Sequence, residues 1–404
     1  MAVQTKEGNA KVQYSLFRRA LIGARLPGLV LDLAGFEFNA QHLLASSNNF
    51  PIRIATKSIR STSILKKILA FSPRFKGLMA YSAAEAAYLA AQGFDDILIG
   101  YPTVERQDLE AAIGQCKLGK KIIFMVCAKE QVDALRGLAK HMRIAIDVCI
   151  DLDQSTPFPG LYFGVHRSSL KTPREVLEFV NYVASDINLR FVGFMGYDAQ
   201  IAGVPDNKPF QVIENHIVRL LKALAMKRIR RERRETCDYL TAHGIKWDLF
   251  NGAGTGSLKA SQDDRSLTEL TAGSGFYGPA LFDGYFDLSL RPALFFVLPV
   301  TRKNGNKWIT CHGGGYIASG SAGKDRLPTP IFPNKLKLFS LEGAGEVQTP
   351  LRGDIAEIKI GDPIFFKHAK AGELCEHFND ITIVKDGQIM ETVQTYRGAG
   401  LSFL

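Results

Sequence analysis

The sequence lacks the long hydrophobic runs and the paired cysteines that would mark a membrane or secreted protein. No stretch reaches the roughly 18 consecutive apolar residues of a membrane-spanning helix, and the polar N-terminus MAVQTKEGNAKVQYS has no signal-peptide core. The six cysteines are scattered without a Cys-x-x-Cys pair, which argues against a disulfide framework. These absences predict a cytoplasmic protein with no membrane partner.

Signatures of nucleic-acid binding are also absent, although the chain carries a net charge of +10. Much of the excess lies in KRIRRERR (227–234), inside a helical pattern that runs from about Pro209 to His243. A basic run on one exposed helix face is usually just solvated. Because no zinc-finger spacing or other nucleic-acid fold signature accompanies it, we expect no nucleic-acid partner.

What the sequence does contain is an alternation of short apolar runs with stretches of helix length. Its 404 residues are 46% hydrophobic and 22% charged, which predicts an ordered globular protein of two domains. Most of the runs are continuously apolar, as expected of parallel strands that are covered on both faces. Eight or nine such units over about 250 residues predict a TIM (β/α)8 barrel. The runs are 28–33, 52–57, 77–82, 95–100, 121–126, 143–150, 161–165, 189–197 and 246–251.

An open doubly wound sheet is the alternative α/β architecture. It is weakened by the absence of a Gly-x-Gly-x-x-Gly motif after the first apolar run. After about Asp283 the pattern changes to short strands with Gly, Asn and Asp turns, which predicts a β-rich domain. We therefore expect an N-terminal segment (1–27) packing near the β domain, a barrel (28–283) and the β domain itself (284–404).

One lysine stands where a barrel enzyme would place a functional group. Functional side chains of TIM barrels lie at the C-terminal ends of the strands, and Lys57 ends the run IRIATK (52–57). A lysine in a partly dry pocket can form a Schiff base with an aldehyde. The alternative is a lysine that closes a strand and points to solvent, since lysine is rarely buried.

Two loops of small residues follow the last expected strands. They are FNGAGTGS (250–257) and ELTAGSGFYGP (269–279), and their backbone N–H groups and hydroxyls can bind phosphate. TIM barrels bind phosphate after their last strands, although either loop could simply connect two elements or lead into the second domain. Together with Lys57, the loops suggest a phosphate-bearing aldehyde held by a lysine, which is pyridoxal 5′-phosphate (PLP).

The chain resembles the fold-type III PLP enzymes, specifically the D-threonine aldolase and D-serine dehydratase branch of the alanine racemase-like barrels. LPGLVLDLAGFEFNAQHLL (26–44) resembles that family's first strand and helix, and IRIATKSIRS (52–61) resembles its Schiff-base segment. The resemblance spans essentially the whole chain and implies a PLP-binding barrel with a D-serine dehydratase-like β domain. It makes Lys57 the PLP lysine. The implied phosphate donors are Gly254, Thr255, Gly256, Gly273 and Ser274.

The resemblance also marks side chains around the cofactor. In FVGFMGYDAQIAG, Tyr197 and Gln200 are candidates to pack on the ring or bind the substrate, although a tyrosine can simply close a strand. Asp153 and Arg167 match the family's Asp-and-Arg segment and would shape the pocket, unless Arg167 pairs with a surface carboxylate.

At the pyridine nitrogen of the cofactor, the resemblance places Thr271 where alanine racemases have an arginine. A neutral hydroxyl neither holds a proton on that nitrogen, as a carboxylate does, nor suppresses it, as a guanidinium does. Thr271 should therefore moderate the electron-withdrawing strength of the ring. This is a weaker argument for racemisation than an arginine would be.

The chain departs from its relatives in FFKHAKAGELCEHFN (365–379). The aldolase and dehydratase branch carries a metal pair here, a His followed two residues later by Cys or Asp. His368 matches, but the partner position is Lys370. Cys375 and His377 could rebuild a zinc or manganese site with His368, since both residue types are zinc ligands. Without a metal, Lys370 would supply the positive charge that stabilises a leaving β-oxygen.

The resemblance implies a PLP-dependent lyase, in which Lys57, His368 and Lys370 are catalytic. Its substrate would be a β-hydroxy D-amino acid, cleaved by retro-aldol reaction or dehydrated, and the protein would be a homodimer. One alternative is an amino-acid racemase, for which Tyr316 is the candidate second base. Another is a PLP-binding protein without enzymatic activity.

Overall fold

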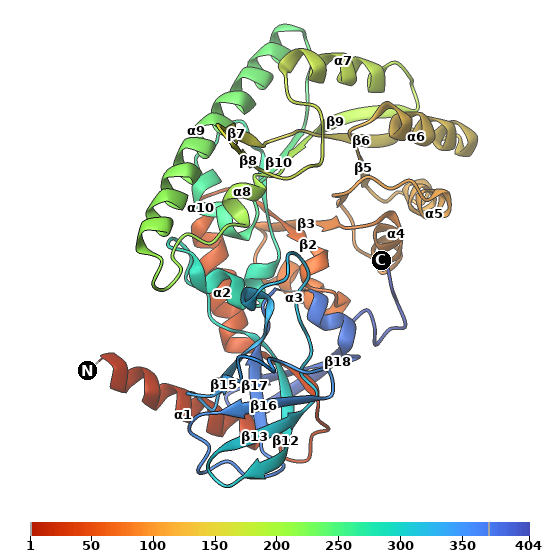
Figure 1. Cartoon of the computed structure of the whole chain (residues 1–404). Coiled ribbons are helices and arrows are strands. Elements are labelled where there is room, and N and C mark those ends of the chain that lie inside the picture. Colours follow the sequence, from red (N-terminus) through yellow and green to blue (C-terminus); the bar gives the residue numbers. More distant parts are fainter. Residues whose placement is uncertain (1, 371) are drawn as a thin grey trace.

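The computed structural model describes residues 2–370 and 372–404. They form a closed α/β barrel and a separate sheet-rich domain, seen in the upper and lower halves of Figure 1. The prediction of a (β/α)8 barrel followed by a β-rich domain is therefore confirmed. None of the helices within these residues is long and apolar enough to cross a membrane.

The barrel is built from parallel strands whose residues are largely buried on both faces, as their continuous apolar runs predict. A compact apolar cluster that includes Leu98, Ile123 and Met195 packs against Met79. Met79 and Met195 also line the pocket described below, so this cluster forms part of its floor. The strands are β2 (Ile52–Ala55), β3 (Phe75–Ala80), β4 (Ile97–Ile99), β5 (Ile122–Val126), β6 (Ile146–Asp151), β9 (Leu189–Gly196), β10 (Leu249–Gly252) and β11 (Glu269–Ala272).

The helices begin where the sequence provides caps. The side chain of Ser82 accepts a hydrogen bond from the Glu85 N–H at the start of one helix, and Thr172 and Glu175 form a reciprocal capping box at the start of another. These caps satisfy N–H groups that have no partner inside the helix. The helices are α2 (Leu33–Ser46), α3 (Thr62–Phe71), α4 (Ala83–Ala91), α5 (Arg106–Lys117), α6 (Lys129–Met142), α7 (Pro173–Ala184), α8 (Ala199–Ala202), α9 (Val212–Ala242) and α10 (Leu258–Ser261).

The first strand of the chain, β1 (Gly28–Asp32), belongs to the sheet-rich domain rather than to the barrel. It pairs antiparallel with β12 and parallel with β18, so the interpretation of 28–33 as a barrel strand is wrong. A strand buried on both faces fits the centre of either sheet, and an apolar run does not identify its partners. The other strands of this domain are β12 (Leu294–Asn304), β13 (Trp308–His312), β14 (Thr329–Phe332), β15 (Lys337–Leu338), β16 (Gln348–Arg352), β17 (Pro363–Lys367), β18 (Asp380–Lys385) and β19 (Gln388–Gln394).

A second apolar run also lies outside the barrel. The run 161–165 forms β8 (Leu161–Phe163), which pairs with β7 (Thr156–Phe158) in a two-stranded ribbon. Leu161 and Tyr162 are exposed, unlike the barrel strands. Its apolar residues therefore reflect a surface hairpin, and the interpretation of this run as a barrel strand is wrong.

Both ends of the chain pack against other parts of the molecule. In helix α1 (Ala2–Ala20), Phe17 packs on Phe295, Phe332 and Phe365 of the sheet-rich domain. The last residues return to the barrel beside α4, where Figure 1 shows the C-terminus, and Phe403 packs on barrel aromatic rings. The sheet-rich domain is thus held to the barrel by a segment beyond its last strand.

Candidate active site

A pocket with about 540 Å³ of empty space, part of which is open to solvent, lies among the C-terminal ends of the barrel strands. Its wall includes residues from the ends of β2, β3, β4, β9, β10 and β11, together with Arg167 from the loop after β8. Parallel strands bring these residues together because all their C-terminal ends lie on the same side of the barrel.

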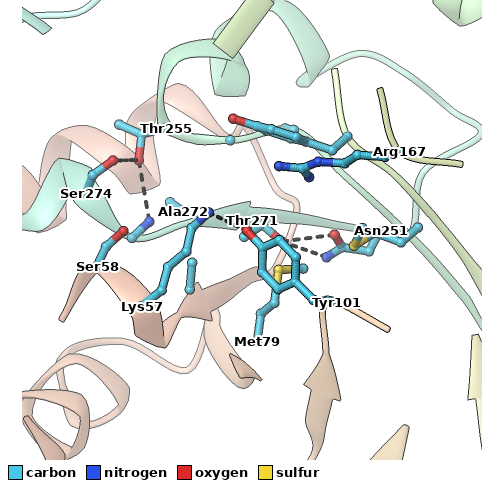
Figure 2. A pocket seen from close by; sticks show the side chains of 17 residues that line it. Lys57, Ser58, Met79, Tyr101, Arg167, Asn251, Thr255, Thr271, Ala272 and Ser274 are labelled. Atoms are coloured by element: carbon cyan, nitrogen blue, oxygen red, sulfur yellow. Dashed lines mark hydrogen bonds between the residues drawn. The ribbon is translucent and has the colours of Figure 1, made fainter. Parts of the chain in front are cut away.

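Lys57 projects into this pocket from the end of β2. It lies in a single turn, η1 (Thr56–Ser58), and it is exposed although its neighbours from Ile52 to Ser61 are buried. The exposure is to the pocket, as Figure 2 shows, and not to the outer surface. The Lys57 Nζ atom lies 2.5 Å from the hydroxyl of Tyr101. The local structure therefore places this lysine in the wall of the pocket.

Tyr101 is a site residue that the sequence analysis missed. It directly follows the apolar run 95–100, so its position after a strand was the available signal. Burial by itself would raise the pKa of Tyr101, but the charges of Lys57 and Arg167 and the Lys57 hydrogen bond outweigh it, so the pKa lies below its ordinary value. Arg167 lies between two aromatic rings, 5.4 Å from that of Tyr101 and 5.2 Å from that of Tyr197.

The two Gly-rich loops meet at the pocket, as Figure 2 shows through Thr255 and Ser274. The Thr255 hydroxyl accepts a hydrogen bond from the backbone N–H of Gly275 at 3.2 Å. A Cβ atom on Gly254 would lie 2.9 Å from the Tyr197 ring, and one on Gly273 would lie 2.6 Å from the Ala55 carbonyl oxygen. Only glycine permits this close approach of backbone, which leaves a cradle of N–H groups and hydroxyls that fits a phosphate.

A buried charge network supports the first loop from below. Asp198 accepts hydrogen bonds from Ser257 (2.7 Å) and Ser261 (3.1 Å), and the Ser257 hydroxyl accepts one from the Gly254 N–H. Arg233 lies 3.7 Å from Asp198 with both side chains fully buried. Burial raises the pKa of Asp198. Together these groups hold the loop in one conformation.

The expectation that the basic run on α9 is solvated is wrong for Arg233. Lys227, Arg231 and Arg234 are exposed as expected, whereas Arg233 points inward. Its guanidinium also pairs with Asp264 at 2.9 Å and donates to the Gly196 carbonyl. Charge composition alone could not separate the one structural arginine from its solvated neighbours.

A second buried network lies under the other side of the pocket. The Thr271 hydroxyl exchanges hydrogen bonds with Asn251 at 2.8 and 3.0 Å. Asn251 also donates to Glu269, which accepts two hydrogen bonds from the Arg53 guanidinium. Thr271 therefore lines the pocket with its neutral hydroxyl held by Asn251.

Gly256 lines a neighbouring cavity rather than this pocket, and three further candidate residues are also placed away from it. Gln200 is buried and donates to the Gln154 carbonyl at 2.6 Å, and Asp153 pairs with Lys171 at 3.1 Å. Tyr316 packs against Phe296 and other rings of the sheet-rich domain. Among the described residues, none of the three belongs to the pocket wall.

The donor set around His368 does not fit a divalent metal. Its Nδ1 lies 3.1 Å from the Leu294 carbonyl, and burial lowers its pKa to about 3. Its buried Nε2 has no hydrogen-bond partner among the residues that the structure describes. Cys375 instead donates to the Ile59 carbonyl at 3.7 Å, and burial raises its pKa to about 12, so it stays a thiol. Within 2–370 and 372–404, no three His, Cys, Asp or Glu side chains come together in a metal-binding group.

Lys370 and His377 lie with His368 around a separate, smaller cavity. Lys370 donates to the Ser319 carbonyl at 3.4 Å. Burial lowers the pKa of Lys370, and the charges of Arg326 and Lys57 add to this effect while Glu373 opposes it. His377 packs on the Tyr316 ring with 5.0 Å between ring centroids.

Comparison with known proteins identifies the fold rather than a sequence family. No family model matches the sequence, and no curated protein matches it. The solved structure of D-threonine aldolase from Filomicrobium marinum is similar with a TM-score of 0.78 and 21% identity, covering 93% of this chain and 96% of that one.

Two further structures share the arrangement. D-threo-3-hydroxyaspartate dehydratase from Delftia sp. HT23 has a TM-score of 0.73 and 17% identity, covering 93% of this chain and 98% of that one. Alanine racemase from Clostridium difficile 630, in complex with cycloserine, has a TM-score of 0.63 and 17% identity, covering 92% and 99%. The chain therefore has the barrel and sheet-rich domain of these proteins at low sequence identity.

Proposed function

We propose that this protein is a PLP-dependent lyase that acts on a β-hydroxy D-amino acid. The observation that carries the proposal is the pocket in which Lys57 faces two glycine-lined loops at the C-terminal end of the barrel. Two of the similar structures are named as enzymes of D-threonine and D-threo-3-hydroxyaspartate, both of which have a β-hydroxyl. The substrate partner would accordingly be a small amino acid.

The residues present fit PLP, with Lys57 as the side chain that bonds to it. We assign the phosphate to the loop cradle, one face of the ring to Tyr197 and Arg167, and the ring nitrogen to the Thr271 hydroxyl. When bound, PLP withdraws electrons from the bonds at the α-carbon of an attached amino acid. Of the residues that we assign to the phosphate cradle, Gly254, Thr255, Gly273 and Ser274 line the pocket, whereas Gly256 lines a neighbouring cavity.

The protein side chains would handle the protons and the β-oxygen. Lys57, as a free amine, accepts and returns the proton at the reacting carbon. Lys370 carries an ammonium, and its lowered pKa makes that group a better proton donor to the departing β-oxygen. His368, the other predicted catalytic residue, is neutral, but its Nε2 is buried, so we assign it no direct contact with the substrate.

Product analysis of the purified protein with PLP tests this function. We expect D-threonine, D-serine or D-3-hydroxyaspartate to be consumed while the L-enantiomers are not. An aldehyde with glycine would identify retro-aldol cleavage, and a 2-oxo acid with ammonia would identify dehydration. Interconversion of D- and L-amino acids without cleavage would contradict the lyase proposal and favour a racemase.

We also propose a cytoplasmic homodimer. All six cysteines are free, which suits a reducing compartment. On α9, Ile213, Ile217, Leu220 and Leu224 share one face and are 48–74% exposed, an apolar surface that a second copy would cover. Sedimentation velocity should give the mass of two chains, and the mass of a single chain would contradict the dimer.

A further inference from the structure

We propose that Tyr101 is a catalytic acid–base residue that exchanges protons with Lys57 while bonds to the lysine nitrogen form and break. The inference rests on the proposed function, because it assumes that Lys57 bonds to the aldehyde of PLP. It adds a residue that neither the sequence motifs nor the resemblance had marked.

The geometry places the Tyr101 hydroxyl on Lys57. Lys57 follows β2 and Tyr101 follows β4, two strands with β3 between them, and the Nζ–Oη distance is 2.5 Å. The Lys57 Nζ atom also lies 5.2 Å from the centre of the Tyr101 ring. Figure 2 shows both side chains converging inside the pocket. A general acid or base must lie within hydrogen-bond reach of the atom that it serves, and Tyr101 meets this condition.

The charges around the pair favour proton exchange. Phenol and alkylammonium groups ordinarily have pKa values of about 10 and 10.4, so a proton passes between them at little cost. Arg167 faces the Tyr101 ring from the loop after β8 and, with Lys57, lowers the Tyr101 pKa against the effect of burial. The phenolate that accepts a proton is therefore accessible closer to neutral pH than in a free tyrosine.

The other titratable groups near the pair are less suited to this role. Burial and Asp198 raise the pKa of Tyr197 to about 12, so its phenolate is rare. Asp151, at the end of β6, has its pKa raised to about 7 by burial, with Arg167 opposing the shift, and is not part of the pocket wall. Arg167 does not release its proton in proteins.

The proton balance requires such a group. A bond forms between the Lys57 nitrogen and the aldehyde carbon, the carbon–oxygen bond breaks, and the oxygen leaves as water with both protons of the amine. Tyr101 as phenolate takes a proton from the nitrogen, and the resulting phenol donates it to the departing oxygen. The same transfers run in reverse when another amine or water displaces Lys57. No oxidant or further reactant is needed.

The test measures how fast PLP attaches to the full-length protein after its removal with hydroxylamine. The attachment is followed by absorbance, and borohydride reduction with peptide mapping places it on Lys57. We expect Tyr101→Phe to slow attachment and release equally, by about 100-fold, because general acid–base groups contribute on this scale. The equilibrium affinity for PLP should change much less, since a catalyst accelerates both directions.

The matched control is Tyr239→Phe, which removes the hydroxyl of a tyrosine on α9, outside the pocket. It should attach PLP at the wild-type rate. Wild-type attachment and release rates in Tyr101→Phe would overturn the inference. The inference would also be overturned if Tyr101→Phe lost affinity for PLP in proportion to its slower attachment, because Tyr101 would then have a structural role. If the wild-type protein attached no PLP at Lys57, the proposed function itself would fail.

Discussion

At the scale of single residues, Lys370 occupies the position at which the resemblance implies a metal ligand, and it lines a cavity separate from the Lys57 pocket. Lys370 stands at the position that would pair with His368, and its ammonium has no lone pair to offer a metal. Its partial burial and the nearby Lys57 and Arg326 charges make it a stronger proton donor than an exposed lysine. A fixed cation can stabilise charge on a leaving oxygen, as a bound metal can.

We expect Lys370→Ala to lower kcat by about 100-fold and to leave PLP affinity within about twofold, since removal of one such charge typically has an effect of this size on kcat. Turnover by the wild-type protein should survive dialysis against a chelator. The measurements are steady-state kinetics and a PLP titration, with Lys307→Ala in the exposed β12–β13 turn as the control. Loss of turnover on chelation and its recovery with zinc or manganese would contradict this role.

At the scale of elements, the loop after β10 depends on close contacts that glycine alone permits. A Cβ atom on Gly254 would lie 2.9 Å from the Tyr197 ring and 3.1 Å from the Ala202 Cβ. Two hydrogen bonds hold the loop: the Gly254 N–H donates to the Ser257 hydroxyl, and the Ser257 hydroxyl donates to Asp198. A side chain at this position must therefore displace either Tyr197 or the loop itself.

Gly254→Val should weaken PLP binding by at least tenfold, since displacement of the cradle removes several phosphate contacts, each of about 1 kcal/mol or more. Equilibrium dialysis with PLP measures the effect. Gly137→Ala on α6 is the matched control, because a Cβ atom there meets nothing within 4 Å, and its affinity should equal that of wild type. An unchanged affinity in Gly254→Val would make the loop a structural turn only.

At the scale of the whole molecule, one buried carboxyl joins the C-terminal segment to the strand end that carries Lys57. Glu85 on α4 accepts hydrogen bonds from Thr56 and from the hydroxyl of Tyr396, both at 2.8 Å. Burial raises the pKa of Glu85 to about 7, although these bonds and the Tyr81 N–H favour its charged form. The folded protein therefore favours the protonated, neutral form of Glu85.

This raised pKa predicts that stability falls as the pH rises. The folded state binds the Glu85 proton more tightly than the unfolded state does. The stabilisation from this proton is therefore complete below about pH 4 and is lost by about pH 7, which changes the free energy of unfolding by up to about 3 kcal/mol. Glu85→Gln cannot ionise and should lose less unfolding free energy between pH 4.5 and 7.5 than wild type. Urea denaturation at both pH values measures this difference.

The control for this prediction is Glu105→Gln at the exposed start of α5, where the side chain makes no cap bond. It should show the wild-type dependence on pH. If the unfolding free energy of Glu85→Gln also depended on pH as in the wild type, Glu85 would have to stay ionised in the folded protein.

The sequence by itself determined the barrel, the β-rich second domain and the place of Lys57. Continuously apolar runs separated by helix-length stretches specify strands that must be covered on both faces, and a polar residue directly after such a run lies at the barrel rim. The two glycine-rich loops could also be predicted from the sequence, because small residues after a strand leave the backbone free to approach a ligand.

Only the tertiary structure decided which strands pair and which side chains meet. β1 has the sequence pattern of a barrel strand, but it lies between β12 and β18 in the other sheet. The sequence pattern shows that the strand is buried on both faces and does not specify its partners. The contact of Lys57 with Tyr101 joins residues 44 positions apart, and the burial of Arg233 beside Asp198 follows from how α9 docks on the barrel. Such contacts depend on the closure of the barrel, which local sequence patterns do not encode.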